Sequence, residues 1–340
     1  MGRLIMPFPH HESLHLTNFT AFGDAAFEFS PGVNIFVGEN GTGKTHLMKV
    51  LYAVQYALSS PRQIDVQRIL GYIFQINDLT LLVRDTNIEQ HIDGHWNSIE
   101  WAFGVKKSSH GSPVPYGYFT LENLPRPVFI PAIDMMAHTR RFLATYDNYE
   151  IPFDQTHRDI VSLLLSPESR NPPADSTARA KLAPLLGGEV VEESEQFYLK
   201  TTNGRQPMQL VAEGVRKIAT LHQLLRNGFL NPGDTLFWDE PEANVNPKLM
   251  DEIVDVLLYL ARSGVQIFLA THSYVILKEF DLQARVADTV RYFALERSES
   301  GTVVHPTDDY SLLAPNPISE QFDRLYDLEL TRATGRRRGA

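Results

Sequence analysis

The alternation of hydrophobic and polar positions predicts two strands and a helix in the first part of the chain. Residues 14–22 roughly alternate apolar and polar side chains, as expected of a strand with one buried face. Residues 33–37 form a second strand that runs directly into a glycine-rich turn. After this turn, residues 47–58 carry apolar side chains three and four positions apart, which predicts a helix with one apolar stripe.

The middle of the chain predicts hairpins followed by helices. Residues 79–83 and 98–103 have the composition of strands, and Asp93-Gly94 between them is typical of a tight hairpin turn. Residues 133–165 have a mostly helical pattern. This part of the chain is therefore expected to form an antiparallel β subdomain and a helical insertion.

The last part of the chain alternates between helix and strand. A helix is expected at residues 215–227, followed by a strand at residues 235–238. A further helix begins at Pro247, and the apolar residues 265–270 predict a strand that is covered on both faces. The fold class predicted from this order is α/β with a mixed central sheet.

Composition and charge narrow the function classes. The 340 residues are 43% hydrophobic and 21% charged, as in an ordinary globular protein. The absence of cysteine excludes disulfides, thiolate zinc sites and cysteine nucleophiles. The net charge of -10 offers no general attraction to nucleic acid or to an anionic membrane. Since no apolar run is long enough for a signal peptide or a membrane helix, we expect a cytoplasmic protein with no membrane partner.

The glycine-rich turn carries the most specific motif in the chain. Residues 38–45 fit the phosphate-loop pattern G-x-x-x-x-G-K-[ST] between a predicted strand and a predicted helix. Inward-facing N–H groups of such a loop, together with the positive end of the helix dipole, bind phosphate. Lys44 is expected to reach the β- and γ-phosphates, and Thr45 to bind Mg²⁺. The residues expected to bind ATP are Gly38, Asn40, Gly41, Thr42, Gly43, Lys44 and Thr45.

Two later strand ends carry the remaining candidate residues. Asp239 and Glu240 end an apolar strand, where Asp239 is predicted to hold Mg²⁺ and Glu240 to orient or deprotonate the attacking water. His272 ends the next apolar strand and is predicted to hydrogen-bond the γ-phosphate or that water. Glu240, His272 and Lys44 are thus the predicted catalytic residues, and ATP and Mg²⁺ the predicted ligands.

These motifs resemble a known family. Residues 38–45, 239–242 and 270–273 resemble the ABC-type P-loop ATPases, and residues 16–22 and 32–41 are similar to their RecF/SMC/OLD branch. The resemblance implies a P-loop NTPase fold with an ABC-type ATPase head. We accordingly divide the chain into an N-terminal half of the head at 1–60, an insertion at 61–205, a C-terminal half of the head at 206–310 and a tail at 311–340.

The same resemblance implies a homodimer that holds ATP between its two heads. Residues 212–217 stand at the position of the family's signature segment, although Ala212 replaces the usual serine. Gly214 is then expected to offer backbone N–H groups to the partner's nucleotide in trans, and Arg216 or Lys217 to supply charge to it in trans.

The function expected from these features is a slow Mg²⁺-dependent ATPase that dimerises on ATP. The resemblance further implies control of an effector protein encoded nearby, as in bacterial antiviral (anti-phage) defence. Two alternatives stay open: a RecF-like DNA-binding repair ATPase, which the charge does not favour, and an ATP-gated scaffold with little turnover.

Overall fold

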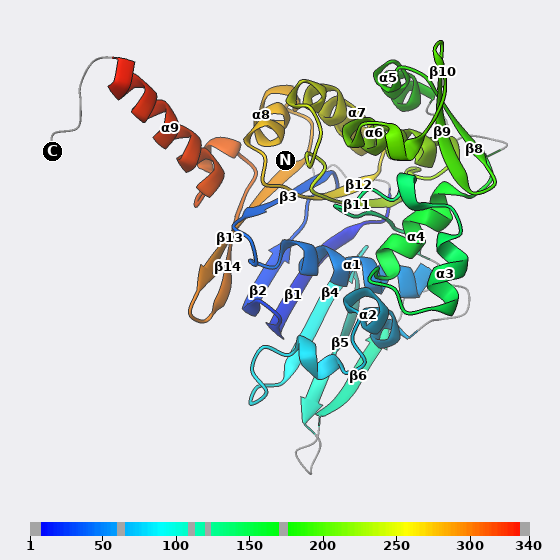
Figure 1. Ribbon diagram of the computed structural model, residues 1–340. Coiled ribbons are helices and arrows are strands. Elements are labelled where there is room, and N and C mark those ends of the chain that lie inside the picture. The colour runs from blue at the N-terminus through cyan, green and yellow to red at the C-terminus, as the bar shows by residue number, and fades with distance from the viewer. Residues whose placement is uncertain (1–7, 60–64, 108–112, 120–123, 170–175, 334–340) are drawn as a thin grey trace.

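The structure is a computed structural model that describes residues 8–59, 65–107, 113–119, 124–169 and 176–333 (Figure 1). Its centre is a six-stranded sheet in the order β14-β13-β3-β12-β11-β7. All neighbouring strands in it are parallel except β13 and β14, which form an antiparallel hairpin. The mixed central sheet predicted from the sequence is thus confirmed. The strands are β3 (Val33–Gly38), β7 (Val128–Ile130), β11 (Thr235–Asp239), β12 (Gln266–Ala270), β13 (Val290–Ser298) and β14 (Gly301–Thr307).

A second, antiparallel sheet of five strands has the order β2-β1-β4-β5-β6. It joins the N-terminal hairpin to strands of the predicted insertion, because β1 pairs with both β2 and β4. The boundary that we expected after residue 60 therefore separates strands of one sheet. The five strands are β1 (His11–Phe19), β2 (Phe22–Glu28), β4 (Gln90–Trp96), β5 (Ile99–Lys107) and β6 (Pro113–Phe119).

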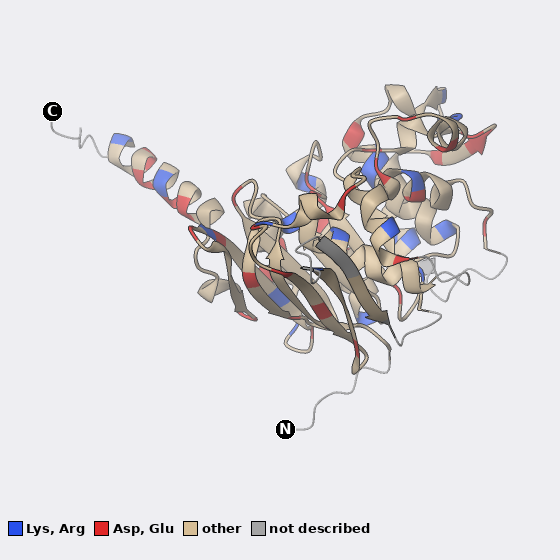
Figure 2. Ribbon diagram, turned by 90° about the horizontal axis from the view of Figure 1, so that it is seen from below, with Lys and Arg blue, Asp and Glu red and all other residues tan. Residues whose placement is uncertain are grey.

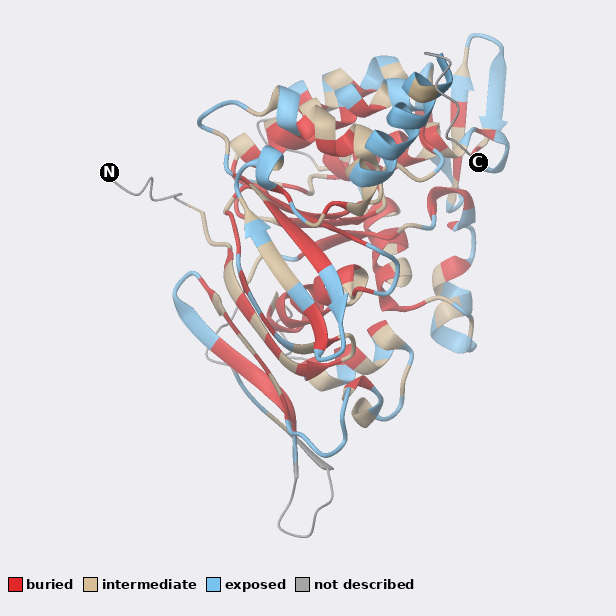
Figure 3. Cartoon of the chain, turned by 90° about the vertical axis from the view of Figure 1, so that its left-hand side faces the viewer, coloured by how far each residue is buried: buried red, intermediate tan, exposed pale blue. Residues whose placement is uncertain are grey.

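The two faces of the central sheet have different coverings. Phe36, Phe237 and Phe268 belong to a core shared with α1 (Lys44–Ser59) and the antiparallel sheet. Ile35 and Leu269 belong to a core shared with helices on the opposite face. This alternation along each strand explains why the parallel strands read as unbroken apolar runs. Figure 3 shows the buried strands lying between these layers.

The helices other than α1 belong mostly to the insertion and the C-terminal half. A small three-stranded sheet lies among them, with β8 (Glu189–Glu193), β9 (Gln196–Thr201) and β10 (Gly204–Pro207). No helix in the described ranges is both long and apolar enough to cross a membrane. The helices are α2 (Val66–Phe74), α3 (Phe142–Asn148), α4 (Gln155–Leu164), α5 (Ser176–Leu186), α6 (Glu213–Arg226), α7 (Met250–Arg262), α8 (Tyr274–Gln283) and α9 (Pro317–Ala333).

The predicted hairpin around Asp93-Gly94 is wrong. Leu79–Leu82 form a 3-10 helix rather than a strand, and both Asp93 and Gly94 lie inside β4. The turn falls at Asn97 and Ser98, whose φ values of 47° and 65° suit a tight hairpin. Gly94 serves close packing instead, since a Cβ there would lie 2.6 Å from the Trp101 ring.

Helix α9 extends from the body with none of its residues buried, and acidic and basic residues are interspersed along it (Figures 1 and 2). Its base is anchored by Phe322, whose ring stacks on Tyr274 of α8 with the ring centroids 4.5 Å apart. The predicted tail at 311–340 thus contains a helix.

A largely buried ion pair links α1 to α4. Lys49 Nζ lies 2.6 Å from Asp154 Oδ2, and the two side chains are 17% and 7% exposed. Asp154 also caps α4 by accepting a hydrogen bond from the Thr156 N–H. Burial alone would raise the pKa of Asp154, but the hydrogen bond from His157 and the charge of Lys49 hold it well below its usual range.

Asp154→Ala is expected to lower the free energy of unfolding by about 3–5 kcal/mol, because it leaves Lys49 buried without its partner. Because the folded-state pKa of Asp154 is depressed, the pair's contribution is full above the unfolded-state pKa of about 4 and is lost as the pH falls below it. Urea unfolding at pH 7 measures the loss. The control is Asp308→Ala, whose pair with Arg291 is exposed, and which should cost less than about 1 kcal/mol. Equal losses in the two variants would contradict the prediction.

Candidate nucleotide site

The predicted site residues converge at one edge of the central sheet. The parallel strands β3, β11 and β12 all end there, so Gly38, Asp239 and Thr271 lie at neighbouring strand ends. Helix α1 begins at the same edge with Lys44. Between these ends is a pocket of about 420 Å³, lined by Thr20, Ala21, Asn40, Gly41, Gly43, Lys44, Thr45, His46, Asp239, Glu240 and His272.

The phosphate loop requires its glycines. Gly41 and Gly43 have φ values of 78° and 95°, which side chains disfavour. A Cβ on Gly43 would lie 2.6 Å from the Phe22 ring. Thr42 donates a hydrogen bond of 2.9 Å to the Glu39 carbonyl oxygen and is fully buried. Thr42 and Gly38 therefore shape the loop, while Gly41 and Gly43 line the pocket.

Lys44 points back into the loop. Its ammonium donates hydrogen bonds to the carbonyl oxygens of Gly38 (2.8 Å) and Glu39 (2.9 Å). Burial lowers the pKa of Lys44 to about 8, while the carboxylates of Asp239 and Glu240 act in the opposite direction. The ammonium is thus charged at neutral pH but poorly solvated, and a phosphate would supply the counter-charge that burial removes.

Thr45 and Asp239 form the pair of oxygens expected of a magnesium site. The Thr45 hydroxyl donates a hydrogen bond of 2.9 Å to Asp239 Oδ2. Burial raises the pKa of Asp239 to about 6, against the lowering effect of the Thr45 hydrogen bond. A hydroxyl and a carboxylate are hard oxygen donors of the kind that Mg²⁺ prefers, and a cation would relieve the cost of burying the carboxylate. The residues present therefore fit Mg²⁺.

Glu240 and His272 face each other across the pocket. His272 Nε2 lies 4.0 Å from Glu240 Oε1, and the side chains are 33% and 42% exposed. Burial and the charge of Lys44 lower the pKa of His272. A neutral imidazole at pH 7 can donate or accept a hydrogen bond, and the accessible carboxylate of Glu240 can accept a proton from water.

Glu242 is a partly buried residue of this site to which the sequence analysis assigned no role. Its Oε1 accepts hydrogen bonds from the Thr271 hydroxyl (2.9 Å) and the His272 N–H (2.7 Å). Burial raises the pKa of Glu242. The carboxylate therefore ties the end of β12 to the loop after β11. Its position in the motif Asp239–Glu242 is the sequence feature that could have indicated Glu242 as a site residue.

Arg297 contacts the phosphate loop, although the sequence analysis did not predict it as a site residue. It lies near the end of β13 and donates a hydrogen bond to the Asn40 carbonyl oxygen in the phosphate loop. A Cβ on Gly41 would meet its guanidinium. Because β13 is distant in sequence and carries no motif, only the pairing of β13 with β3 brings this cation to the loop.

The structure places the predicted signature residues in contacts within the same chain. Arg216 donates a hydrogen bond of 2.6 Å from Nε to Asp134 Oδ2. A Cβ on Gly214 would lie 3.0 Å from Val245 Cα, so this glycine permits close packing against the loop after β11. Within its own head the Arg216 guanidinium is thus paired with Asp134, and its role toward a partner's nucleotide stays a prediction.

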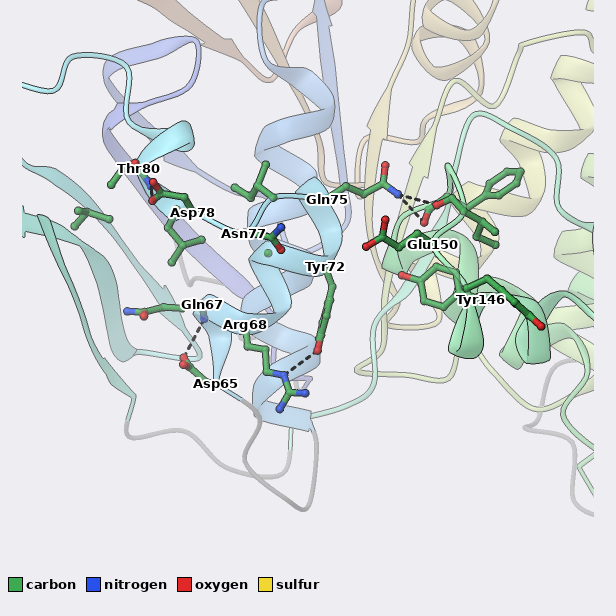
Figure 4. A pocket seen from close by; sticks show the side chains of 17 residues that line it. Asp65, Gln67, Arg68, Tyr72, Gln75, Asn77, Asp78, Thr80, Tyr146 and Glu150 are labelled. Atoms are coloured by element: carbon green, nitrogen blue, oxygen red, sulfur yellow. Dashed lines mark hydrogen bonds between the residues drawn. The ribbon is translucent and has the colours of Figure 1, made fainter.

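A larger cavity, of about 1020 Å³, lies on another flank (Figure 4). It is lined by α2 and by the segment from α3 to the start of α4, and the Gln75 amide crosses it to donate to the carbonyl oxygens of Ile151 and Phe153. Its lining includes neither the glycine loop nor the Asp239 and Glu240 pair. The smaller pocket is the candidate site, because its lining contains the residues that can bind phosphate and Mg²⁺.

Fold and site together indicate a P-loop nucleotide-binding domain, and comparisons with known proteins show what it is similar to. Residues 13–93 match a family model described as "AAA domain". Residues 154–278 match one described as "AAA domain, putative AbiEii toxin, Type IV TA system". The DNA replication and repair protein RecF of Lysinibacillus sphaericus is 42% identical over 50 residues, which are 15% of this chain and 14% of that protein.

Solved structures agree on the fold. An Smc head bound to the C-terminal winged-helix domain of ScpA superposes with a TM-score of 0.56 and 14% identity, over 88% of this chain and 97% of that one. An Smc head from Pyrococcus furiosus, bound to the C-terminal domain of ScpA, gives 0.52 and 11%, over 94% and 100%. The chain thus shares the fold of Smc heads and a short stretch similar to RecF, and together with the AAA family models these likenesses support a RecF/SMC-like P-loop ATPase.

Proposed function

We propose that this chain binds Mg²⁺-ATP in the pocket at the end of β3 and hydrolyses it. The observation that carries this proposal is the convergence of Lys44, the Thr45–Asp239 pair and the facing Glu240 and His272 on one pocket. Each group matches one requirement of phosphoryl transfer: charge on the phosphates, oxygen ligands for a metal, and a base beside the attacking water.

In the proposed reaction, the protein acts through positioning and charge. Backbone N–H groups of the loop and the Lys44 ammonium hold the β- and γ-phosphates. Glu240 orients the water and accepts its proton, and His272 hydrogen-bonds the γ-phosphate or the water. Mg²⁺ held by Thr45 and Asp239 would offset negative charge on the phosphates.

We infer that two copies close over the nucleotide. The support is the accessibility of Glu240 and His272, which leaves one side of the reacting groups open to water. The likeness to Smc heads also supports this inference. A second head placed over the pocket would exclude that water from the reacting groups. In this dimer, the backbone at Gly214 would donate hydrogen bonds to the partner's nucleotide.

Glu240→Gln is expected to sediment as a dimer with ATP and Mg²⁺ and as a monomer without ATP, because slowed hydrolysis preserves the closed state. Sedimentation velocity measures the shift. The matched control is the double variant Lys44→Ala/Glu240→Gln, which should stay monomeric under both conditions. A mass that does not respond to ATP would contradict ATP-driven dimerisation.

We propose that the ATP-dependent state controls a separate effector protein, as in antiviral defence. The family model over residues 154–278 carries a toxin–antitoxin description, which favours such a partner. Co-purification of the neighbouring gene product with Glu240→Gln in ATP, and not in ADP, tests this role. Failure of any effector to co-purify would count against this role. A chain that binds ATP with no measurable turnover would also count against it and would point to an ATP-gated scaffold.

RecF-like DNA binding is the second candidate, and the match to RecF is the observation that favours it. The net charge of -10 opposes it. Binding to duplex DNA that weakens steeply between low and physiological salt would support this function over effector control.

A further inference from the structure

Lys217 is a buried cation beside the pocket. It lies in the second turn of α6, is 1% exposed, and donates a hydrogen bond of 2.8 Å to the carbonyl oxygen of Glu240. Burial lowers the pKa of Lys217, and the carboxylates of Glu213 and Glu242 act in the opposite direction. Burying an ammonium costs free energy, and an apolar side chain at the same place would avoid this cost but could not donate the hydrogen bond to Glu240.

The backbone of Glu240 is held in an unusual conformation. Its φ is 49°, in the left-handed region that residues other than glycine rarely adopt. The Glu240 N–H donates to the Ala270 carbonyl oxygen (2.9 Å), and its own carbonyl oxygen accepts from the Ala243 N–H (3.1 Å) and from Lys217. Hydrogen bonds thus fix the backbone on both sides, while the carboxylate remains accessible.

The start of α6 supports the same loop at a second point. Gly214, three residues before Lys217, packs so closely that a Cβ there would lie 3.0 Å from Val245 Cα and 3.1 Å from the Asn244 carbonyl oxygen. Helix α6 therefore contacts the loop after β11 through one close packing contact and one charged hydrogen bond. Only the hydrogen bond acts directly on Glu240.

We propose that Lys217 is a positioning residue that keeps the Glu240 backbone left-handed, so that the carboxylate faces the attacking water. This inference rests on the proposed ATPase function. Loss of the ammonium would free the peptide between Glu240 and Pro241 to rotate toward a commoner conformation, which would move the carboxylate. Lys217 therefore acts on its own head rather than on a partner's nucleotide.

Lys217→Met tests this role, because methionine keeps the length and apolar stem without the donor. We expect kcat to fall about tenfold to a hundredfold, as small misplacements of a reacting group do, with the affinity for ATP unchanged. Phosphate release measures kcat, and calorimetric titration with ATP measures binding. The matched control is Lys181→Met, which removes a lysine that is 36% exposed and paired with Asp255, and which should leave both values unchanged.

A second variant covers the case in which Lys217→Met does not fold. Lys217→Gln keeps an uncharged N–H donor. If both variants fold, the kcat of Lys217→Gln should lie between those of Lys217→Met and the wild type. If only Lys217→Gln folds, its kcat should lie below that of the wild type. Wild-type kcat in a folded Lys217→Met or Lys217→Gln protein would overturn the positioning role. A loss of ATP affinity as large as the loss of kcat would also overturn it. Absence of turnover in the wild-type chain would instead overturn the proposed function, and this inference with it.

Discussion

Glu240→Gln is expected to lower ATP turnover by about a hundredfold or more, the usual contribution of a positioned general base. The carboxylate is 42% exposed in the pocket and faces His272, so it can reach a water beside the γ-phosphate. Glutamine has nearly the same shape but cannot accept the proton. ATP binding should persist, because Glu240 does not belong to the phosphate loop. Steady-state phosphate release at saturating ATP measures the loss.

The control for this prediction is Glu252→Gln, which neutralises an exposed acid in the first turn of α7. It changes the net charge by the same amount and should turn over at the wild-type rate. If Glu240→Gln also hydrolysed ATP at the wild-type rate, Glu240 would not be the base.

Lys44→Ala is expected to weaken ATP binding by at least tenfold, since hydrogen bonds to charged groups contribute about 1.5–3 kcal/mol. The ammonium lies in the loop that surrounds the phosphates and is 6% exposed. Burial has lowered its pKa to about 8, so the fold itself disfavours the charged form. For this reason the substitution should cost little stability while costing affinity. Calorimetric titration measures the change.

The pKa of Lys44 adds a pH dependence to this prediction. Above pH 8 the free protein loses the Lys44 charge, so wild-type affinity for ATP should decline there, whereas Lys44→Ala should show no such decline. The control Lys278→Ala removes a partly exposed lysine that pairs with Asp281 away from the pocket, and this variant should bind ATP as the wild type does. Undiminished binding by Lys44→Ala would contradict the assignment of the phosphate site.

The phosphate loop and the two strand ends could be predicted from the sequence because their chemistry is local. Gly38 to Thr45 are contiguous, and Asp239 and His272 each follow an apolar run that marks a strand end. Since parallel strands bring their carboxyl ends to one edge, their meeting in space followed from the order of elements.

The remaining parts of the site depend on contacts between distant segments. Arg297 reaches the loop only because β13 pairs with β3, and Lys217 reaches Glu240 only because α6 packs against the loop after β11. Arg297 belongs to no local motif, and the signature segment 212–217 does not reveal that its Lys217 contacts Glu240. Gly94 misled the hairpin prediction for a related reason: its small size serves the neighbouring Trp101 ring rather than a turn.

The central claim is that the pocket formed by Lys44, Thr45, Asp239, Glu240 and His272 hydrolyses Mg²⁺-ATP. Phosphate release from ATP by the wild-type chain, measured with Mg²⁺ and then with excess EDTA, tests it most directly. We predict turnover that requires Mg²⁺ and that Lys44→Ala and Glu240→Gln both lose. Turnover that survives EDTA or both substitutions, or no turnover by the folded wild-type chain, would contradict the claim.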